Sequence, residues 1–121
     1  MDNANSPGIK VLMYHRIIED NLPGKDSWLC VHIDDFKKQL QVLDFLGYTT
    51  ITFWDYKLYL SGQLSLPKKP IILTFDDGYS DVYELAYPAM KKMGMKGVVF
   101  AMGNRHKMNS GWNSENKLNL Y

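Results

Sequence analysis

Residues 70–79 read PIILTFDDGY, and this stretch decides the fold. Residues 71–75 are almost entirely apolar and do not alternate with polar side chains, which is typical of a strand buried on both faces of an α/β sheet. Pro70 can open such a strand. Two carboxylates, Asp76 and Asp77, follow directly, and Gly78 permits a tight turn after them. The stretch therefore predicts a buried strand that carries two acids at its carboxyl end.

Strand and helix patterns alternate on both sides of this stretch. Apolar residues recur with a helical period through Phe36, Leu40, Leu43 and Leu46, with Gly47 as a stop. The alternation is the signature of a parallel α/β fold. The expected strands are residues 9–14, 48–52, 71–75 and 97–102, and the expected helices are residues 34–46, 53–60 and 80–93, the last kinked at Pro88. Residues 1–8 and 104–121 have no convincing period and are expected to be flexible.

Composition excludes several classes of protein. A chain of 121 residues is one domain or part of one, and its 45% hydrophobic and 22% charged residues exclude a wholly disordered chain. Fourteen basic and thirteen acidic residues nearly cancel, which disfavours a nucleic-acid binder. The single cysteine, Cys30, excludes an intrachain disulfide. No apolar run is long enough to span a membrane, and the first eight residues do not resemble a signal peptide.

The adjacent acids Asp76 and Asp77 are the strongest candidates for chemistry. Ligands of parallel sheets bind beyond the carboxyl ends of the strands. Two carboxylates held this close repel each other when both are ionised, so a shared proton or a nearby cation is expected. The alternative is a simple Asp-Asp-Gly turn in which an aspartate caps the next helix. The fully apolar strand before the acids favours the functional interpretation.

Histidines and tryptophans supply weaker candidates. His15 ends the first predicted strand and could face the same mouth as Asp76, although a structural histidine would also fit there. His32 is expected to cap a helix or lie on the surface. Trp112, in a polar loop, is a candidate sugar platform, whereas Trp54 is expected to pack in the core.

The motif resembles a known family. Residues 74–79 (TFDDGY) resemble the first motif of the polysaccharide deacetylases, the NodB-homology family or carbohydrate esterase family 4. Residues 12–17 (LMYHRI) resemble the opening of the subgroup related to biofilm and poly-N-acetylglucosamine deacetylases. The resemblance implies the N-terminal half of a distorted (β/α)7-type barrel, incomplete in this chain, with residues 1–121 as a partial domain.

The resemblance also implies a chemistry. The family removes N-acetyl or O-acetyl groups from polysaccharides with a divalent metal, for which zinc is the expected ion. By motif match, Asp76 is the general base and Asp77 is a metal ligand. The same resemblance implies a polysaccharide substrate and a location outside the cell or in the cell envelope.

The chain departs from the family pattern at the metal site. The family completes this site with two histidines spaced His-x-x-x-His, whereas this chain has only His15, His32 and His106, and no pair has that spacing. Hydrolytic metal sites usually need three protein ligands. The sequence therefore predicts a truncated fragment that is inactive by itself.

Two other classes of function stay open. The sheet edge beyond the fourth strand could pair with another chain, which would make this a non-catalytic interaction module that self-associates. Receiver-like phosphoacceptor domains also gather aspartates around Mg²⁺, but they take an acid pair from the first strand. Here the first strand ends in Tyr14-His15, which disfavours that class.

Overall fold

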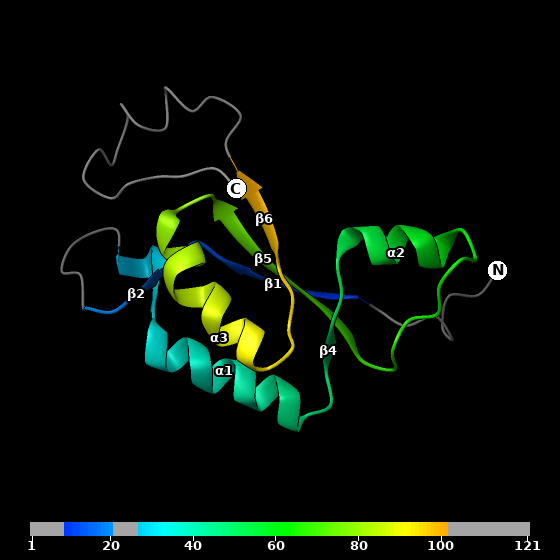
Figure 1. Cartoon of the computed structure of the whole chain (residues 1–121), viewed down its shortest axis with the longest axis horizontal. Coiled ribbons are helices and arrows are strands. Elements are labelled where there is room, and N and C mark those ends of the chain that lie inside the picture. Colours follow the sequence, from blue (N-terminus) through cyan, green and yellow to red (C-terminus); the bar gives the residue numbers. More distant parts are fainter. Residues whose placement is uncertain (1–8, 21–26, 102–121) are drawn as a thin grey trace.

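A computed structural model describes residues 9–20 and 27–101, and the predictions for residues 1–8, 104–121, His106 and Trp112 lie outside this range. The described residues form a parallel α/β fold, as the sequence predicted (Figure 1). Four parallel strands make the main sheet: β1 (Lys10–Tyr14), β4 (Thr49–Thr50), β5 (Pro70–Asp77) and β6 (Val98–Ala101).

Strand β5 lies at the centre of this sheet. β1 runs along one edge of β5, in a register that ends with Tyr14 opposite Phe75. On the other edge, β4 pairs with the start of β5, and β6 pairs with its end, where Ala101 lies opposite Asp77. Residues 71–75 are buried, as predicted. The register brings the residue after β1, His15, beside the acids at the end of β5.

Helix α1 (Ile33–Phe45) follows the predicted apolar stripe. Phe36, Leu40 and Leu43 are buried, whereas Leu46 is half exposed because the helix ends just before it. His32 caps the helix: its Nδ1 accepts a hydrogen bond from the Asp34 backbone N–H at 3.1 Å, and the predicted cap is confirmed.

Helix α2 (Phe53–Leu60) forms where it was predicted, but it does not enter the core. Trp54 is 61% exposed, so the prediction that it packs in the core was wrong. The physical reason is that α2 buries none of its residues. Lys57 Nζ instead lies 5.1 Å from the centre of the Trp54 ring.

The predicted kinked helix is a π-helical segment (Val82–Ala86) followed by α3 (Tyr87–Lys92). Pro88 lies in the first turn of α3, where its missing N–H is tolerated. The N–H of Tyr87 reaches back five residues to the Val82 carbonyl, which is the hydrogen bond of a π-turn. The predicted irregularity at Pro88 is therefore confirmed as a change of helix type.

Three short elements were missed by the sequence analysis. β2 (Arg16–Ile18) and β3 (Cys30–His32) pair in parallel as a separate two-stranded sheet, and a 3₁₀ turn (Ser27–Leu29) precedes β3. Strands of three residues are too short to show a period of two, and their pairing joins residues far apart in the chain.

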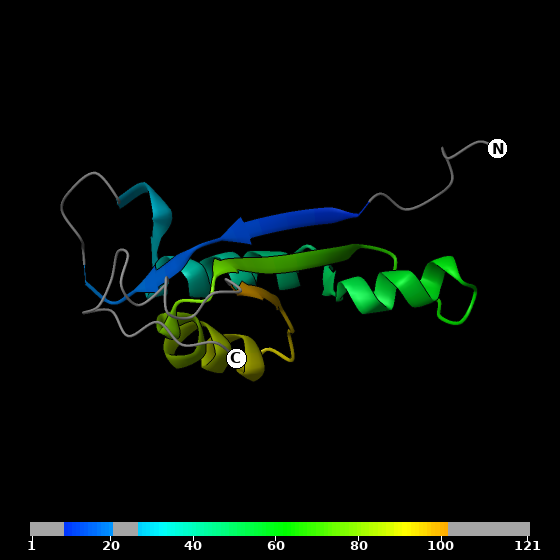
Figure 2. The ribbon, with the colours of Figure 1, turned by 90° about the horizontal axis from the view of Figure 1, so that it is seen from above.

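The two faces of the main sheet differ. Helices α1 and α3 lie on the same side of β1 and β5 (Figure 2). On that side Phe75 stacks on Tyr14, with ring centroids 5.4 Å apart, and meets Phe36 edge-on at 5.9 Å. Side chains alternate along a strand, so Met13 and Asp76 point to the opposite face. Met13 is 63% exposed there.

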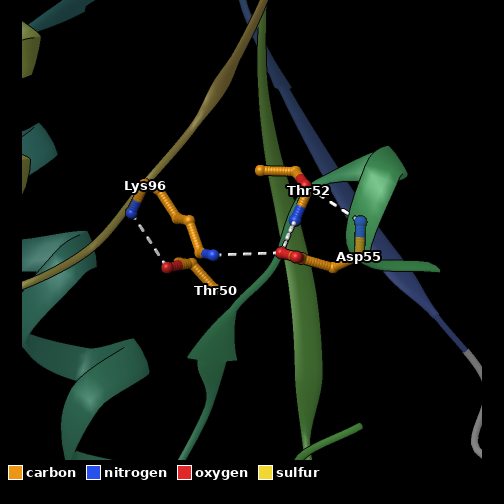
Figure 3. Close-up of polar contacts among 4 residues, drawn as sticks. All are labelled: Thr50, Thr52, Asp55 and Lys96. Atoms are coloured by element: carbon orange, nitrogen blue, oxygen red, sulfur yellow. Dashed lines mark hydrogen bonds and ion pairs between the residues drawn. The ribbon is translucent and has the colours of Figure 1, made fainter. Parts of the chain in front are cut away.

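A cluster of polar contacts connects the end of β4, the start of α2 and the segment before β6 (Figure 3). The Lys96 backbone N–H donates to Thr50 Oγ1 at 2.9 Å, and Lys96 Nζ lies 3.0 Å from Asp55 Oδ2. Thr52 and Asp55 form a capping box at the start of α2, each side chain accepting from the other's backbone N–H. The cluster ties the segment before β6 to the end of β4 and to α2.

Replacing Asp55 by asparagine should therefore make the free energy of unfolding depend less on pH in the acidic range. The Thr52 backbone N–H, and then Lys96, hold the pKa of Asp55 below its ordinary value of 3.8. A lowered folded-state pKa stabilises the fold above pH 3.8, and this stabilisation is lost as the pH falls through the folded-state pKa. At pH 7 Asp55→Asn should lower the free energy of unfolding by about 0.5–1 kcal/mol, because it removes the charge that pairs with a half-exposed lysine.

Urea unfolding of both proteins at pH 7 and pH 2.5 measures this effect. The difference between them should shrink at the acidic pH. An equal difference at both values would contradict a role for the ionised Asp55 carboxylate.

Candidate active site

The two acids at the end of β5 share one hollow. In a regular strand adjacent side chains point to opposite faces. Asp77, however, has φ +77°, and Gly78 follows with φ +71°. A positive φ is uncommon for a residue other than glycine, and aspartate is among those that tolerate it. The turned backbone lets Asp77 line the same face as Asp76, as the sequence predicted from Gly78.

This hollow lies on the sheet face away from α1 and α3, and its volume is about 440 Å³. Its walls come from β1, β5, β6 and the first residue of α2. The lining residues are Val11, Met13, Phe53, Thr74, Asp76, Asp77, Phe100 and Ala101. Two carboxylates thus stand in a mainly apolar concavity at the carboxyl ends of parallel strands, where such folds bind ligands.

The alternative of a simple turn with a capping aspartate does not describe this geometry. The helical backbone that follows begins at Ser80, and neither Asp76 nor Asp77 occupies its cap position. Asp81 itself makes no side-chain cap hydrogen bond. The acids of the motif are therefore not explained by helix capping.

His15 faces the acid pair from the neighbouring strand. Its Nε2 lies 3.9 Å from Asp76 Oδ2, and the two side chains are 21% and 28% exposed. Both side chains are thus partly accessible to water. The structure brings Asp76, Asp77 and His15 together, while the catalytic and metal-binding roles assigned to them stay predictions.

Two tightly placed ionisable groups lie just behind the acids. Burial raises the pKa of Tyr79 to about 12, and the negative charge of Asp77 adds to this effect. Burial also raises the pKa of Asp81, although the Arg16 guanidinium, whose Nε lies 3.0 Å from Asp81 Oδ2, opposes the rise. Tyr79 therefore keeps its phenolic proton at neutral pH.

Sequence reasoning missed several neighbours of the site. Arg16 and Asp81 meet across 65 positions of the chain, and the Phe53 and Phe100 rings meet at 5.8 Å in the wall of the hollow. The Trp28 ring lies 6.4 Å from that of His15. Of these residues, only Asp81 could have been noticed from the sequence, because it lies four residues after Asp77. The other contacts depend on how distant elements fold together.

The donor atoms suit a hard or borderline divalent cation, but they form only part of a site. Carboxylate oxygens bind zinc and magnesium, and hydrolytic zinc sites usually have three protein ligands. Among residues 9–20 and 27–101, no group of three His, Cys, Asp or Glu side chains could hold a metal ion. Asp77 therefore fits as one ligand of a set that needs partners from beyond the described residues.

A larger hollow of about 560 Å³ lies between β1 and α1. It is lined mainly by apolar residues and has neither a carboxylate nor a histidine in its wall, so it is not the chemical centre. Both β1 and β6 have an unpaired outer edge among the described strands. Self-association through such an edge stays a prediction. None of the described helices has the length and apolar character needed to cross a membrane.

Comparison with known proteins identifies relatives of this arrangement. Residues 63–118 match the family described as Polysaccharide deacetylase. A Bacillus subtilis (strain 168) protein named "Putative polysaccharide deacetylase YxkH" is 37% identical over 95 residues, which are 78% of this chain and 32% of that protein.

Solved structures agree with this match. The structure of IcaB from Ammonifex degensii is 33% identical, with a TM-score of 0.63 over 79% of this chain and 39% of that one. The Streptococcus pyogenes deacetylase PplD, solved in complex with acetate, is 30% identical, with a TM-score of 0.69 over 95% of this chain and 49% of that one. The chain thus spans between a third and a half of the length of these relatives.

Proposed function

Because this chain corresponds to the N-terminal portion of a NodB-type polysaccharide deacetylase domain, we propose that it supplies the acidic part of an active site for removing acetyl groups from an N-acetylated polysaccharide. The observation that carries the proposal is that Asp76 and Asp77 line one hollow and that His15 lies 3.9 Å from Asp76. The acetate bound to the S. pyogenes deacetylase supports it, since acetate is the product of such a reaction.

Asp77 is proposed to hold a divalent cation, with zinc as the expected ion. A bound cation of this kind acidifies water and polarises the amide carbonyl. The protein's own contribution is to aim a charged carboxylate into the hollow through the positive φ of Asp77. The remaining ligands would come from beyond the described residues.

Asp76 and His15 are proposed to move the protons. Asp76 accepts a proton from the water that attacks the acetyl carbon. The C–N bond then breaks, and the departing sugar nitrogen takes a proton from protonated His15, which leaves acetate and a free amino sugar. The 3.9 Å between His15 Nε2 and Asp76 Oδ2 supports this division, because the two groups are close enough to act on one substrate. A polysaccharide substrate further implies that the protein acts at the cell envelope or outside it.

The chain by itself is proposed to be inactive, because residues 9–20 and 27–101 contain no group of three ligands that could hold the cation. A chimera tests this: the part of this chain that aligns with the B. subtilis relative replaces the matching 95-residue segment of that protein. Acetate release from N-acetylglucosamine oligomers is measured for the chain, the chimera and the chimera treated with a chelator.

Release by the untreated chimera alone is the expected result. Release by the chain alone would overturn the proposed incompleteness. Release that survives removal of all metal would overturn the proposed metal dependence.

A further inference from the structure

Next to the hollow lined by Asp76 and Asp77, hydrogen bonds join two segments that follow proposed functional residues. One is the segment after His15, and the other is the segment after the Asp77-Gly78 turn. Asp81 Oδ2 accepts a hydrogen bond from Arg16 Nε at 3.0 Å, and Asp81 Oδ1 accepts one from the Ile17 backbone N–H at 3.4 Å. The Asp81 carboxylate therefore accepts hydrogen bonds from both the side chain of Arg16 and the backbone of Ile17, the two residues that follow His15.

Burial strengthens these two hydrogen bonds. The Arg16 and Asp81 side chains are only 15% and 14% exposed. Ile17 is fully buried in the core, and the Arg16 guanidinium lies 4.9 Å from the centre of the buried Tyr79 ring. Shielded charge-assisted hydrogen bonds are stronger than those in water, and a buried pair loses much stability when one partner is removed.

We propose that Arg16 and Asp81 are positioning residues that hold His15 against Asp76. His15 immediately precedes the residues that Asp81 binds, and Asp76 lies five positions before Asp81. The β1–β5 register brings His15 beside Asp76, and the Asp81 contact adds a second restraint on the 3.9 Å separation of His15 Nε2 and Asp76 Oδ2. Asp81 binds the side chain of Arg16 and the backbone N–H of Ile17, so both residues act through the segment that carries His15. This inference rests on the proposed function and adds two residues to it.

The test uses Asp81→Asn in the chimera defined above. Asparagine keeps the shape and one acceptor oxygen, but it loses the charge that holds Arg16. We expect kcat to fall about tenfold, because small misplacements of catalytic groups have large effects on rate. KM should change less than twofold, because no group that binds substrate is removed.

The matched control is Lys96→Met, which removes an ion pair of the same 3.0 Å length that does not contact the His15 segment. This variant should keep kcat within twofold. Arg16→Lys keeps the positive charge but not the Nε donor. Its kcat should lie between that of the parent chimera and that of Asp81→Asn. The double variant Arg16→Lys/Asp81→Asn should be no slower than Asp81→Asn alone, because both changes break one contact.

A second readout does not depend on activity. In the NMR spectrum of the 121-residue chain, the imidazole signal of His15, identified by its loss in His15→Gln, should shift in Asp81→Asn and stay unchanged in Lys96→Met. If the parent chimera is inactive, the proposed function fails and this signal alone decides the positioning role. Should Asp81→Asn fail to fold, Arg16→Lys provides both readouts. A folded variant with kcat within twofold of the parent, or with an unchanged His15 signal, would overturn the inference.

Discussion

Replacing Asp77 by asparagine is expected to lower acetate release by the chimera more than about 100-fold, which is the upper range for losing a residue that only supports a metal ligand. Asparagine tolerates the positive φ at this position, so the backbone turn should survive. The change removes the negative charge proposed to hold the cation. Zinc affinity, measured by titration against a competing chelator, should fall together with the rate.

Asp76→Asn separates the two carboxylates. It should slow acetate release by about 10²- to 10⁴-fold, the range for a general base, while zinc affinity stays close to that of the parent. Asp44→Asn is the control, because Asp44 is an exposed aspartate on α1 far from the motif in sequence. Equal loss of zinc affinity in Asp76→Asn and Asp77→Asn would contradict the division of roles.

The largest effect on stability is expected for Phe75→Ala. Phe75 is 1% exposed and contacts both Tyr14 and Phe36 through its ring. Truncating a buried phenylalanine to alanine costs about 3–5 kcal/mol, a large part of the 5–15 kcal/mol that stabilises a typical domain. Urea unfolding followed by circular dichroism should show a much lower midpoint or no cooperative transition.

Phe45→Ala is the matched control for this change. Phe45 is the same residue type at the end of α1, but it is 88% exposed. Its replacement should alter the free energy of unfolding by less than about 0.5 kcal/mol. Similar losses for the two variants would contradict the assignment of Phe75 to the core.

The regular parts of the fold could be predicted from local patterns. The apolar run of residues 71–75 indicated a buried strand, and the spacing of Phe36, Leu40 and Leu43 indicated the buried face of α1. Trp54 was misplaced because a helical pattern does not reveal whether the helix meets the core, and α2 does not. β2 and β3 were missed because three residues carry too little periodicity.

The candidate site was predictable only where one short stretch contained it. Asp76, Asp77 and Gly78 are adjacent in sequence, so their turn chemistry was visible without a structure. The sequence placed His15 at the end of the first strand as a possible neighbour of Asp76, and the parallel register of β1 and β5 brings the two together. The hydrogen bonds from Arg16 and Ile17 to Asp81 also join residues far apart in the sequence, so local patterns do not reveal them.

The most direct test is the location of the metal. Crystals of the chimera grown with zinc would be measured by anomalous diffraction at the zinc edge. The account predicts an anomalous peak at about 2.0–2.2 Å from a carboxylate oxygen of Asp77, within the hollow that Asp76 also lines. A zinc ion bound without Asp77, or an Asp77 side chain turned away from that hollow, would contradict it.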